Sequence, residues 1–140
     1  MEQVTPAYAK PLPKKDPLNA PFWEHAKAHR FAVQHCPQCN DLRFPATQVC
    51  PNCLAEGHDW KVVSGSGTVQ YWVHFHRAYW PGFEAELPYN VCAIRLDEGP
   101  LVLSNVVRTR PDELRAGMRV QAVFEDVTAS VTLPKFARTE

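Results

Sequence analysis

Two Cys-x-x-Cys pairs constrain the fold of this chain more than any other feature of its sequence. Cys36 and Cys39 form the first pair, Cys50 and Cys53 form the second, and ten residues separate the pairs. Two residues between cysteines allow a tight turn to direct both sulfur atoms at one point, and two such turns joined by a β-hairpin complete a tetrahedron. Asn40 follows the first pair, where the backbone often needs a positive φ that asparagine tolerates well. The spacing therefore predicts a four-cysteine metal-binding ribbon.

The predicted metal is zinc, held as a structural ion. Four thiolates fill a tetrahedral shell, so no position remains for a water molecule or a substrate. Rubredoxin holds iron with the same geometry, and iron stays as the alternative, although nothing in the sequence indicates electron transfer. Disulfides are the other interpretation of paired cysteines, but thiols stay reduced in the cytoplasm. The first residues show neither a charged start followed by an apolar run nor a small-residue cleavage site, so we expect a cytoplasmic protein.

The charge balance disfavours partners that are recruited by electrostatic attraction. Fifteen basic and fifteen acidic residues give a formal net charge of zero. This removes the usual reason to expect non-specific binding to nucleic acid or to an anionic membrane. No stretch approaches the roughly 20 apolar residues that cross a bilayer. With 45% hydrophobic residues, the 140 residues suffice for the core of one domain.

Composition divides the chain into three parts. Residues 1–18 contain four prolines and three lysines, and they predict an extended arm, because such proline density excludes helix and sheet. Residues 19–60 are predicted to hold a short helix followed by the ribbon. Asn19 is a suitable cap for this helix, which is predicted to continue to His29. Residues 61–140 are predicted to form a β-barrel.

Five runs in the last part alternate with the period of two that marks half-buried strands. The runs are Val69–His76, Tyr89–Leu96, Leu101–Val107, Arg119–Glu125 and Val131–Phe136. Pro111–Leu114, between the third and fourth runs, predicts a helical turn. Five strands with a short helix before the fourth indicate a small closed barrel of the OB type. The expected fold is therefore mainly β, with an N-terminal helix, a rubredoxin-like four-cysteine zinc ribbon and a five-stranded OB-fold barrel.

Two groups outside the cysteine pairs are candidates for contact with a ligand or a partner. Trp80 and Phe83 belong to a loop rich in large apolar groups, which either forms a contact surface or caps the barrel. Lys27 and Arg30, with three lysines of the arm, form a basic cluster that either meets phosphates or is a solvated fringe. Cys92 lies in phase with the apolar residues of its run, which predicts a buried core cysteine and not a nucleophile.

The order of these parts resembles a family of proteins with a rubredoxin-like ribbon followed by an OB fold. The family, long labelled a domain of unknown function, accompanies thiolase-like and hydroxymethylglutaryl-CoA-synthase-like enzymes. The matching motifs are Pro21–Glu24, both cysteine pairs with Phe44–Pro45 between them, Ser64–Val69, Val91–Leu96 and Leu114–Val120. The resemblance implies a non-catalytic subunit that binds a thiolase-fold partner and helps to shape the channel for the pantetheine arm of CoA. The residues implied to contact CoA or the partner are Phe22, Trp23, Arg43 and Phe44.

Two departures from the family pattern are visible. Asn40 stands where the family usually has glycine, which is conformationally mild. Ala46-Thr47 replaces a common proline-arginine, which removes a cation and any role that the family gives to it.

These observations favour an accessory subunit of a thiolase, retro-aldolase or acyltransferase that acts on acyl-CoA. A nucleic-acid-binding module is the alternative, because ribbons and OB barrels both serve that end. The zero net charge and the acidic residues of the predicted barrel loops argue against it. A self-sufficient enzyme ranks last, since no paired acid and base and no activated nucleophile are visible.

Overall fold

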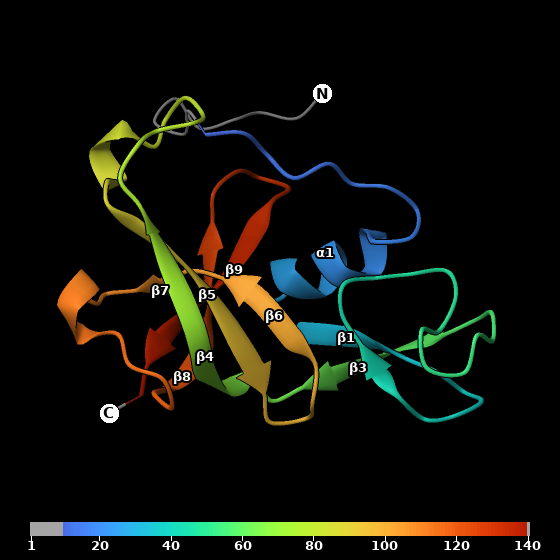
Figure 1. Cartoon of the computed structure of the whole chain (residues 1–140). Coiled ribbons are helices and arrows are strands. Elements are labelled where there is room, and N and C mark those ends of the chain that lie inside the picture. Colours follow the sequence, from blue (N-terminus) through green and yellow to red (C-terminus); the bar gives the residue numbers. More distant parts are fainter. Residues whose placement is uncertain (1–9, 140) are drawn as a thin grey trace.

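The computed structural model describes residues 10–139 as a mainly β protein with one α-helix (Figure 1). The helix is α1 (Ala20–Lys27), and the strands are β1 (Phe31–His35), β2 (Leu42–Arg43), β3 (Asp59–Val63), β4 (Ser66–Phe75), β5 (Tyr89–Leu96), β6 (Leu101–Ser104), β7 (Val106–Val107), β8 (Arg119–Asp126) and β9 (Thr132–Arg138). Two short 3-10 helices, η1 (Glu84–Glu86) and η2 (Pro111–Glu113), lie in the loops, and η2 confirms the predicted helical turn. Within the described residues no helix has the length and apolar character to cross a membrane.

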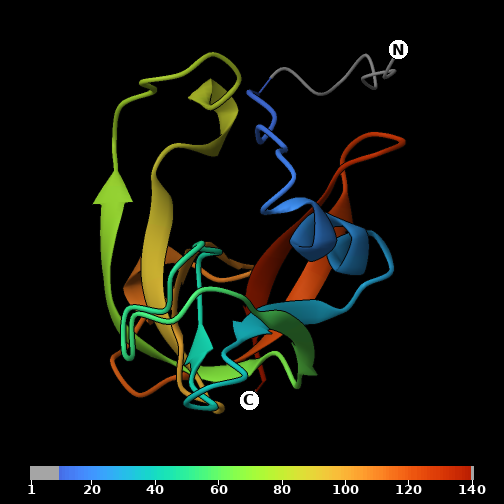
Figure 2. The same cartoon turned by 90° about the vertical axis from the view of Figure 1, so that its right-hand side faces the viewer.

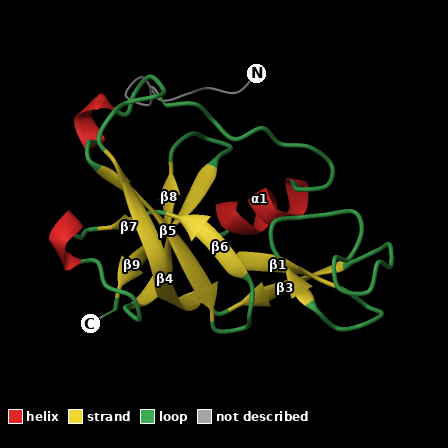
Figure 3. Ribbon diagram, viewed as in Figure 1, coloured by secondary structure: helices red, strands yellow, loops and turns green. Residues whose placement is uncertain are grey.

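The strands form two sheets (Figure 3). Strands β2, β1 and β3 form an antiparallel sheet in that order, which is the ribbon. The other six strands form a sheet in the order β6-β5-β4-β8-β9-β7, in which the short β7–β9 pair is parallel. This second sheet is OB-like but not closed.

The open sheet differs from the closed five-stranded barrel that the sequence predicts. The predicted third strand is broken at Asn105 into β6 and β7, which pair with opposite parts of the sheet, β6 with β5 and β7 with β9. Asn90 accounts for the break. Its side chain accepts a hydrogen bond from the N–H of Val106 and donates one to the C=O of the same residue, both at 2.8 Å. These hydrogen bonds replace the backbone hydrogen bonds that would extend β6 into β7. The two segments are therefore separate strands, and the sheet has six strands.

Helix α1 ends earlier than the sequence predicts. Asn19 occupies the N-cap position, but its side chain does not cap the helix, because its Oδ1 accepts a hydrogen bond from the backbone N–H of Asp16 (2.8 Å). The helix ends at Lys27, and His29 has a φ of 61° that no helix contains. The prediction of a helix that reaches His29 is therefore two residues too long.

Helix α1 packs between the ribbon and the six-stranded sheet (Figures 1 and 2). The ring centroid of Phe22 lies 5.6 Å from that of Phe31 in β1, which in turn lies 6.0 Å from that of Phe136 in β9. These rings belong to one cluster of buried apolar residues that continues through Val69 and Ile94. The ribbon and the OB-like sheet thus share a single hydrophobic core.

The described part of the predicted arm lies along the surface without helix or strand from residue 10 to residue 16. Lys10 Nζ lies 2.6 Å from Glu86 Oε2 and 5.2 Å from the ring centroid of Phe83. Lys15 donates a hydrogen bond to the C=O of Ser130 (2.7 Å). Residues 1–9 of the arm lie outside the described residues.

Candidate metal centre and adjoining cavities

The four cysteines of the two pairs meet at one point. Their sulfur atoms all lie within 4.8 Å of one another, with Cys36 Sγ 3.6 Å from Cys53 Sγ and Cys39 Sγ 3.7 Å from Cys50 Sγ. A tetrahedral zinc ion with Zn–S distances of about 2.3 Å places its sulfur ligands about 3.8 Å apart. A disulfide needs sulfur atoms about 2.05 Å apart, and all four cysteines are free thiols. The donor set therefore fits a tetrahedral metal ion.

Each pair lies in a turn with the same backbone pattern. The N–H of Asn40 donates to the C=O of Cys36, and the N–H of Leu54 donates to the C=O of Cys50, both at 2.8 Å. Asn40 and Leu54 have φ values of 64° and 66°. The left-handed conformation that the sequence predicts after a Cys-x-x-Cys pair is thus present in both turns.

Backbone N–H groups and the crowding of four sulfur atoms determine the protonation of the cluster. The N–H of Cys39 is directed at the Cys36 sulfur and lowers the pKa of the Cys36 thiol to about 6, although burial opposes this. The N–H of Cys53 lowers the pKa of Cys50 in the same way. The N–H of Ala55 also favours the Cys53 thiolate, but burial and the other three sulfur atoms raise the pKa of Cys53 to about 12. Like charges this close oppose full ionisation, which a divalent cation relieves.

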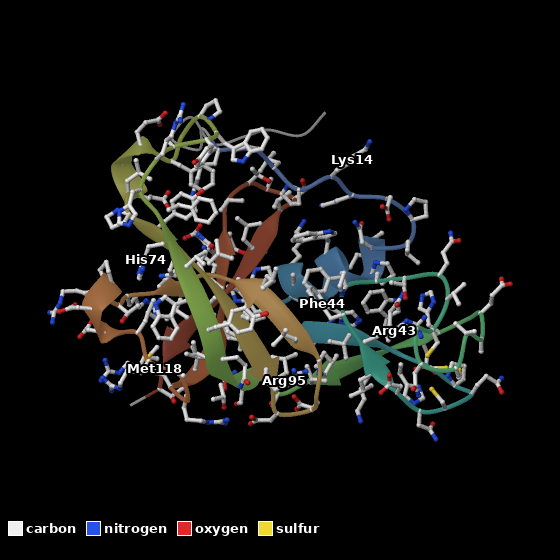
Figure 4. The ribbon with its side chains drawn as sticks, viewed as in Figure 1. Lys14, Arg43, Phe44, His74, Arg95 and Met118 are labelled. Carbon is white, nitrogen blue, oxygen red and sulfur yellow. The ribbon has the colours of Figure 1, made fainter. Side chains whose placement is uncertain are left out.

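An aromatic cluster separates two cavities at the junction of α1, the ribbon and the sheet. Phe22 and Trp23 of α1 and Phe44, which follows β2, line both cavities. The larger cavity, of about 270 Å³, extends toward β6 and β9, and the smaller cavity, of about 130 Å³, extends toward Arg43 and Trp60. Figure 4 shows Phe44 and Arg43 side by side where the ribbon meets the helix. The walls of both cavities are mainly apolar.

The structure brings four of the predicted contact residues together and separates the other four from them. The predicted residues that line the smaller cavity are Phe22, Trp23, Arg43 and Phe44. Lys27 and Arg30 lie at the far end of α1 and line neither cavity. Trp80 and Phe83 belong to the loop between β4 and β5, where the Phe83 ring packs 4.8 Å from that of Tyr89.

Sequence reasoning missed most of the residues that line these cavities. Trp60 of β3 lines the smaller cavity, and Leu103 of β6 and Lys135 of β9 line the larger one. Lys135 is only 9% exposed, and its Nζ lies 3.1 Å from Glu125 Oε1. No local motif marks these positions, because the sheet topology alone brings β6 and β9 to α1.

Exposed apolar side chains lie on β4 and β6, the two strands that flank β5. Tyr71 and Leu103 lie opposite each other across the buried Ala93, which pairs with both. Tyr71, Val73 and Leu103, which we call the outer stripe, are 59%, 54% and 65% exposed. Trp80, in the loop that follows β4, is 61% exposed, which favours a contact surface over a barrel cap for this loop. Exposed apolar groups that gather on one part of a surface mark interaction sites.

Cys92 is a core residue, as the sequence predicts. It is fully buried, and burial raises the pKa of its thiol to about 11. The thiol donates a hydrogen bond to Asn90 Oδ1 (3.3 Å). A nucleophilic cysteine needs the opposite setting, with a lowered pKa and access for a substrate.

The fold and the thiol cluster define a protein with a rubredoxin-like zinc ribbon followed by an OB-fold domain. Sequence models of both domains match the chain in this order, "ChsH2, rubredoxin-like zinc ribbon domain" at residues 23–59 and "ChsH2, C-terminal OB-fold domain" at residues 60–125. The chain belongs to the ChsH2 family, in which such domains are also named DUF35.

The relatives include larger proteins, which this chain matches over only part of their length, and proteins of similar length. The "Probable enoyl-CoA hydratase alpha subunit" of Thermomonospora curvata is 33% identical over 131 residues, which are 94% of this chain but 40% of that protein. A "DUF35 domain-containing scaffold protein" of Methanocaldococcus jannaschii is 29% identical over 115 residues, 81% of each chain. The solved structure "Ltp2-ChsH2(DUF35) aldolase" has a chain with a TM-score of 0.81 and 32% identity, and the match covers 91% of this chain and 98% of that one.

Proposed function

We propose that this chain is a non-catalytic accessory subunit that docks to and orders a thiolase-like enzyme acting on acyl-CoA. Its likeness to a chain of "Ltp2-ChsH2(DUF35) aldolase" carries the proposal, because the match covers 98% of that chain at 32% identity. The name of a second relative, a scaffold protein, supports a non-catalytic role. The match to part of a probable enoyl-CoA hydratase alpha subunit supports an assembly that acts on acyl-CoA. None of these three names refers to nucleic acid, so they give the nucleic-acid alternative no support.

The proposal assigns a structural zinc ion to Cys36, Cys39, Cys50 and Cys53. A bound zinc ion neutralises the crowded thiolates and ties the two turns together. The loop between the turns carries Phe44, so the metal fixes the position of this ring against α1. Iron is the alternative ion for the same four thiolates.

The proposal places part of the acyl-CoA at the larger cavity. Trp23, Phe44 and Leu103 supply apolar walls for a pantetheine arm, and Lys135 lies in the same lining. At about 270 Å³ the cavity is slightly smaller than the pockets that enclose whole ligands. We therefore assign it only a segment of the arm. The exposed cations Lys27, the last residue of α1, and Arg30, which follows the helix, are assigned to the phosphate groups.

The outer stripe is the proposed docking surface for the catalytic partner. Leu103 belongs both to this stripe and to the wall of the larger cavity. A partner that covers the stripe therefore also reaches the mouth of the cavity. This arrangement encloses an acyl-CoA between two subunits without any catalytic group on this chain.

Co-purification tests the proposal. The tagged chain is co-expressed with a thiolase-like protein from the same genome, as wild type and as Leu103→Asp. A charge in the centre of an apolar interface is expected to reduce the recovered partner by at least about tenfold. Val62→Asp is the matched control, because Val62 is also exposed (46%) but lies in the ribbon sheet. The proposal is wrong if the chain does not bind the thiolase-like protein and instead binds oligonucleotides with a steep salt dependence.

A further inference from the structure

Arg43 is a buried cation without a charged partner. The residue is 5% exposed. Its Nε donates a hydrogen bond to Gln34 Oε1 (2.8 Å) and its Nη2 donates one to the C=O of Thr47 (3.2 Å). Neither oxygen carries a charge, and within residues 10–139 no carboxylate forms an ion pair with this guanidinium. Burial of an uncompensated charge is costly, so an anion at this position is strongly favoured.

Three unpartnered N–H donors belong to Arg43, to its hydrogen-bond partner Gln34, and to Trp23, which lines the same cavity as Arg43. The donors are Arg43 Nη1, Gln34 Nε2 and Trp23 Nε1, and each is buried without a hydrogen-bond acceptor among the described residues. Gln34 is fully buried, and its Oε1 is already occupied by Arg43 and by the backbone N–H of Thr47 (2.8 Å). Trp23 and Arg43 both line the smaller cavity. The unpartnered polar atoms of these two lining residues are therefore donors, and one of them is charged.

The lining of the smaller cavity restricts what such a ligand is. Apart from Asn19 and Arg43, the wall is made by Trp60, Pro45, Ala46 and the rings shared with the larger cavity. The wall contains no acidic residue. At about 130 Å³ the cavity is far smaller than the 300–1,000 Å³ pockets of whole ligands. It suits a short apolar stem that ends in an acceptor group, and it is too small for a nucleotide.

We propose that the smaller cavity is a carboxylate-binding site in which Arg43 is the principal ligand group. The N–H groups of Nη1 and the remaining N–H of Nη2 form the end of the guanidinium fork, which matches the two oxygens of a carboxylate. The carboxylate comes either from a short aliphatic acid or from an acidic side chain of the catalytic partner. This inference rests on the proposed function only for the second of these sources.

Titration of the free chain with butyrate tests the first source. Butyrate is expected to shift the NMR signal of the Trp23 indole N–H, while butyramide, which has the same shape without the charge, is not. Arg43→Met keeps the stem and removes the charge, so it is expected to abolish the shift. Arg43→Lys keeps the charge but not the fork and is expected to weaken binding by about tenfold. A circular dichroism spectrum and a metal analysis establish that each variant remains folded.

Affinity for the partner tests the second source. If an acidic side chain of the partner fills the cavity, Arg43→Met weakens the complex by at least about tenfold, and complex formation blocks the effect of butyrate on Trp23. Lys61→Met is the control, because Lys61 is an exposed cation on strand β3 of the same sheet. A butyrate response with no partner binding supports the site and contradicts the proposed function. The site is overturned if butyrate has no effect on the free chain and Arg43→Met leaves partner binding unchanged, or if butyrate has no effect and the partner does not bind.

Discussion

The two residues that follow the cysteine pairs share a backbone conformation that suits one of them better than the other. Asn40, with a φ of 64°, also places its Oδ1 3.2 Å from the ring Nε2 of His35. Leu54, with a φ of 66°, is 75% exposed. A left-handed conformation costs a residue with a Cβ about 1–2 kcal/mol, and asparagine less than most. The second turn therefore contains strain that no packing of the Leu54 side chain offsets.

Replacement of Leu54 by asparagine is expected to stabilise the protein. Leu54→Asn relieves the strain without loss of a buried contact, so we expect the free energy of unfolding to increase by up to about 1 kcal/mol. Chemical denaturation at a fixed zinc concentration measures this change. Leu103→Asn is the control, since Leu103 is similarly exposed (65%) but lies in a strand. Equal effects of the two substitutions would show that exposure, and not backbone strain, determines the result.

At the scale of elements, an ion pair joins three strands at one end of the OB-like sheet. Arg119 at the start of β8 makes a two-pronged contact with the carboxylate of Asp97, which follows β5, at 2.7 and 2.8 Å. The same guanidinium donates to Thr68 Oγ1 of the intervening strand β4 (3.0 Å). The hydrogen bonds from Arg119 hold the pKa of Asp97 below its usual value. The contact therefore strengthens the β5-β4-β8 pairing only while Asp97 is ionised.

Acid is expected to weaken this contact in a predictable direction. Because the pKa of Asp97 is lowered in the folded chain, its contribution is fully present above the unfolded value of about 3.9 and is lost as the pH falls through the folded value. In Asp97→Asn the free energy of unfolding is therefore expected to fall less steeply below about pH 4. Denaturant titrations between pH 3 and pH 7 measure the slope. Arg119→Gln is expected to reduce the slope of the free energy of unfolding against pH to the same extent. A double variant with a still smaller slope would contradict the assignment of this pH dependence to the Asp97–Arg119 ion pair.

The elements differ in how well they could be predicted from the sequence. The cysteine spacing was sufficient to predict the ribbon and the left-handed Asn40, and period-two alternation located the strands. The break at Asn105 was not predictable, since it depends on hydrogen bonds between Val106 and the side chain of Asn90, which is 16 residues away. The same limit applies to the site. The family resemblance indicated Phe22 and Phe44, but Lys135 lines a cavity only because of the sheet order.

At the scale of the whole molecule, the metal cluster and the OB-like sheet depend on the same core. Strands β1 and β3 hold the two cysteine turns in the ribbon, and they also contribute Phe31, Val33 and Val63 to the buried cluster that includes Val69 and Phe136. A ribbon that unfolds therefore removes apolar cover from the sheet. Stability of the two parts is coupled through packing and not only through the chain connection.

Removal of the metal is consequently expected to destabilise the entire chain and not the ribbon alone. Binding of a structural zinc ion contributes on the order of 10 kcal/mol to folding, which is comparable with the total stability of a domain. A chelator is expected to abolish the cooperative thermal transition and to expose Trp60 of β3, and one equivalent of zinc is expected to restore both. Cys39→Ser is expected to reproduce the effect of the chelator. Cys92→Ala, which removes a thiol outside the cluster, is expected to keep one metal ion per chain and a single transition. A metal-free chain with an unchanged melting temperature would show that the sulfur cluster does not support the shared core.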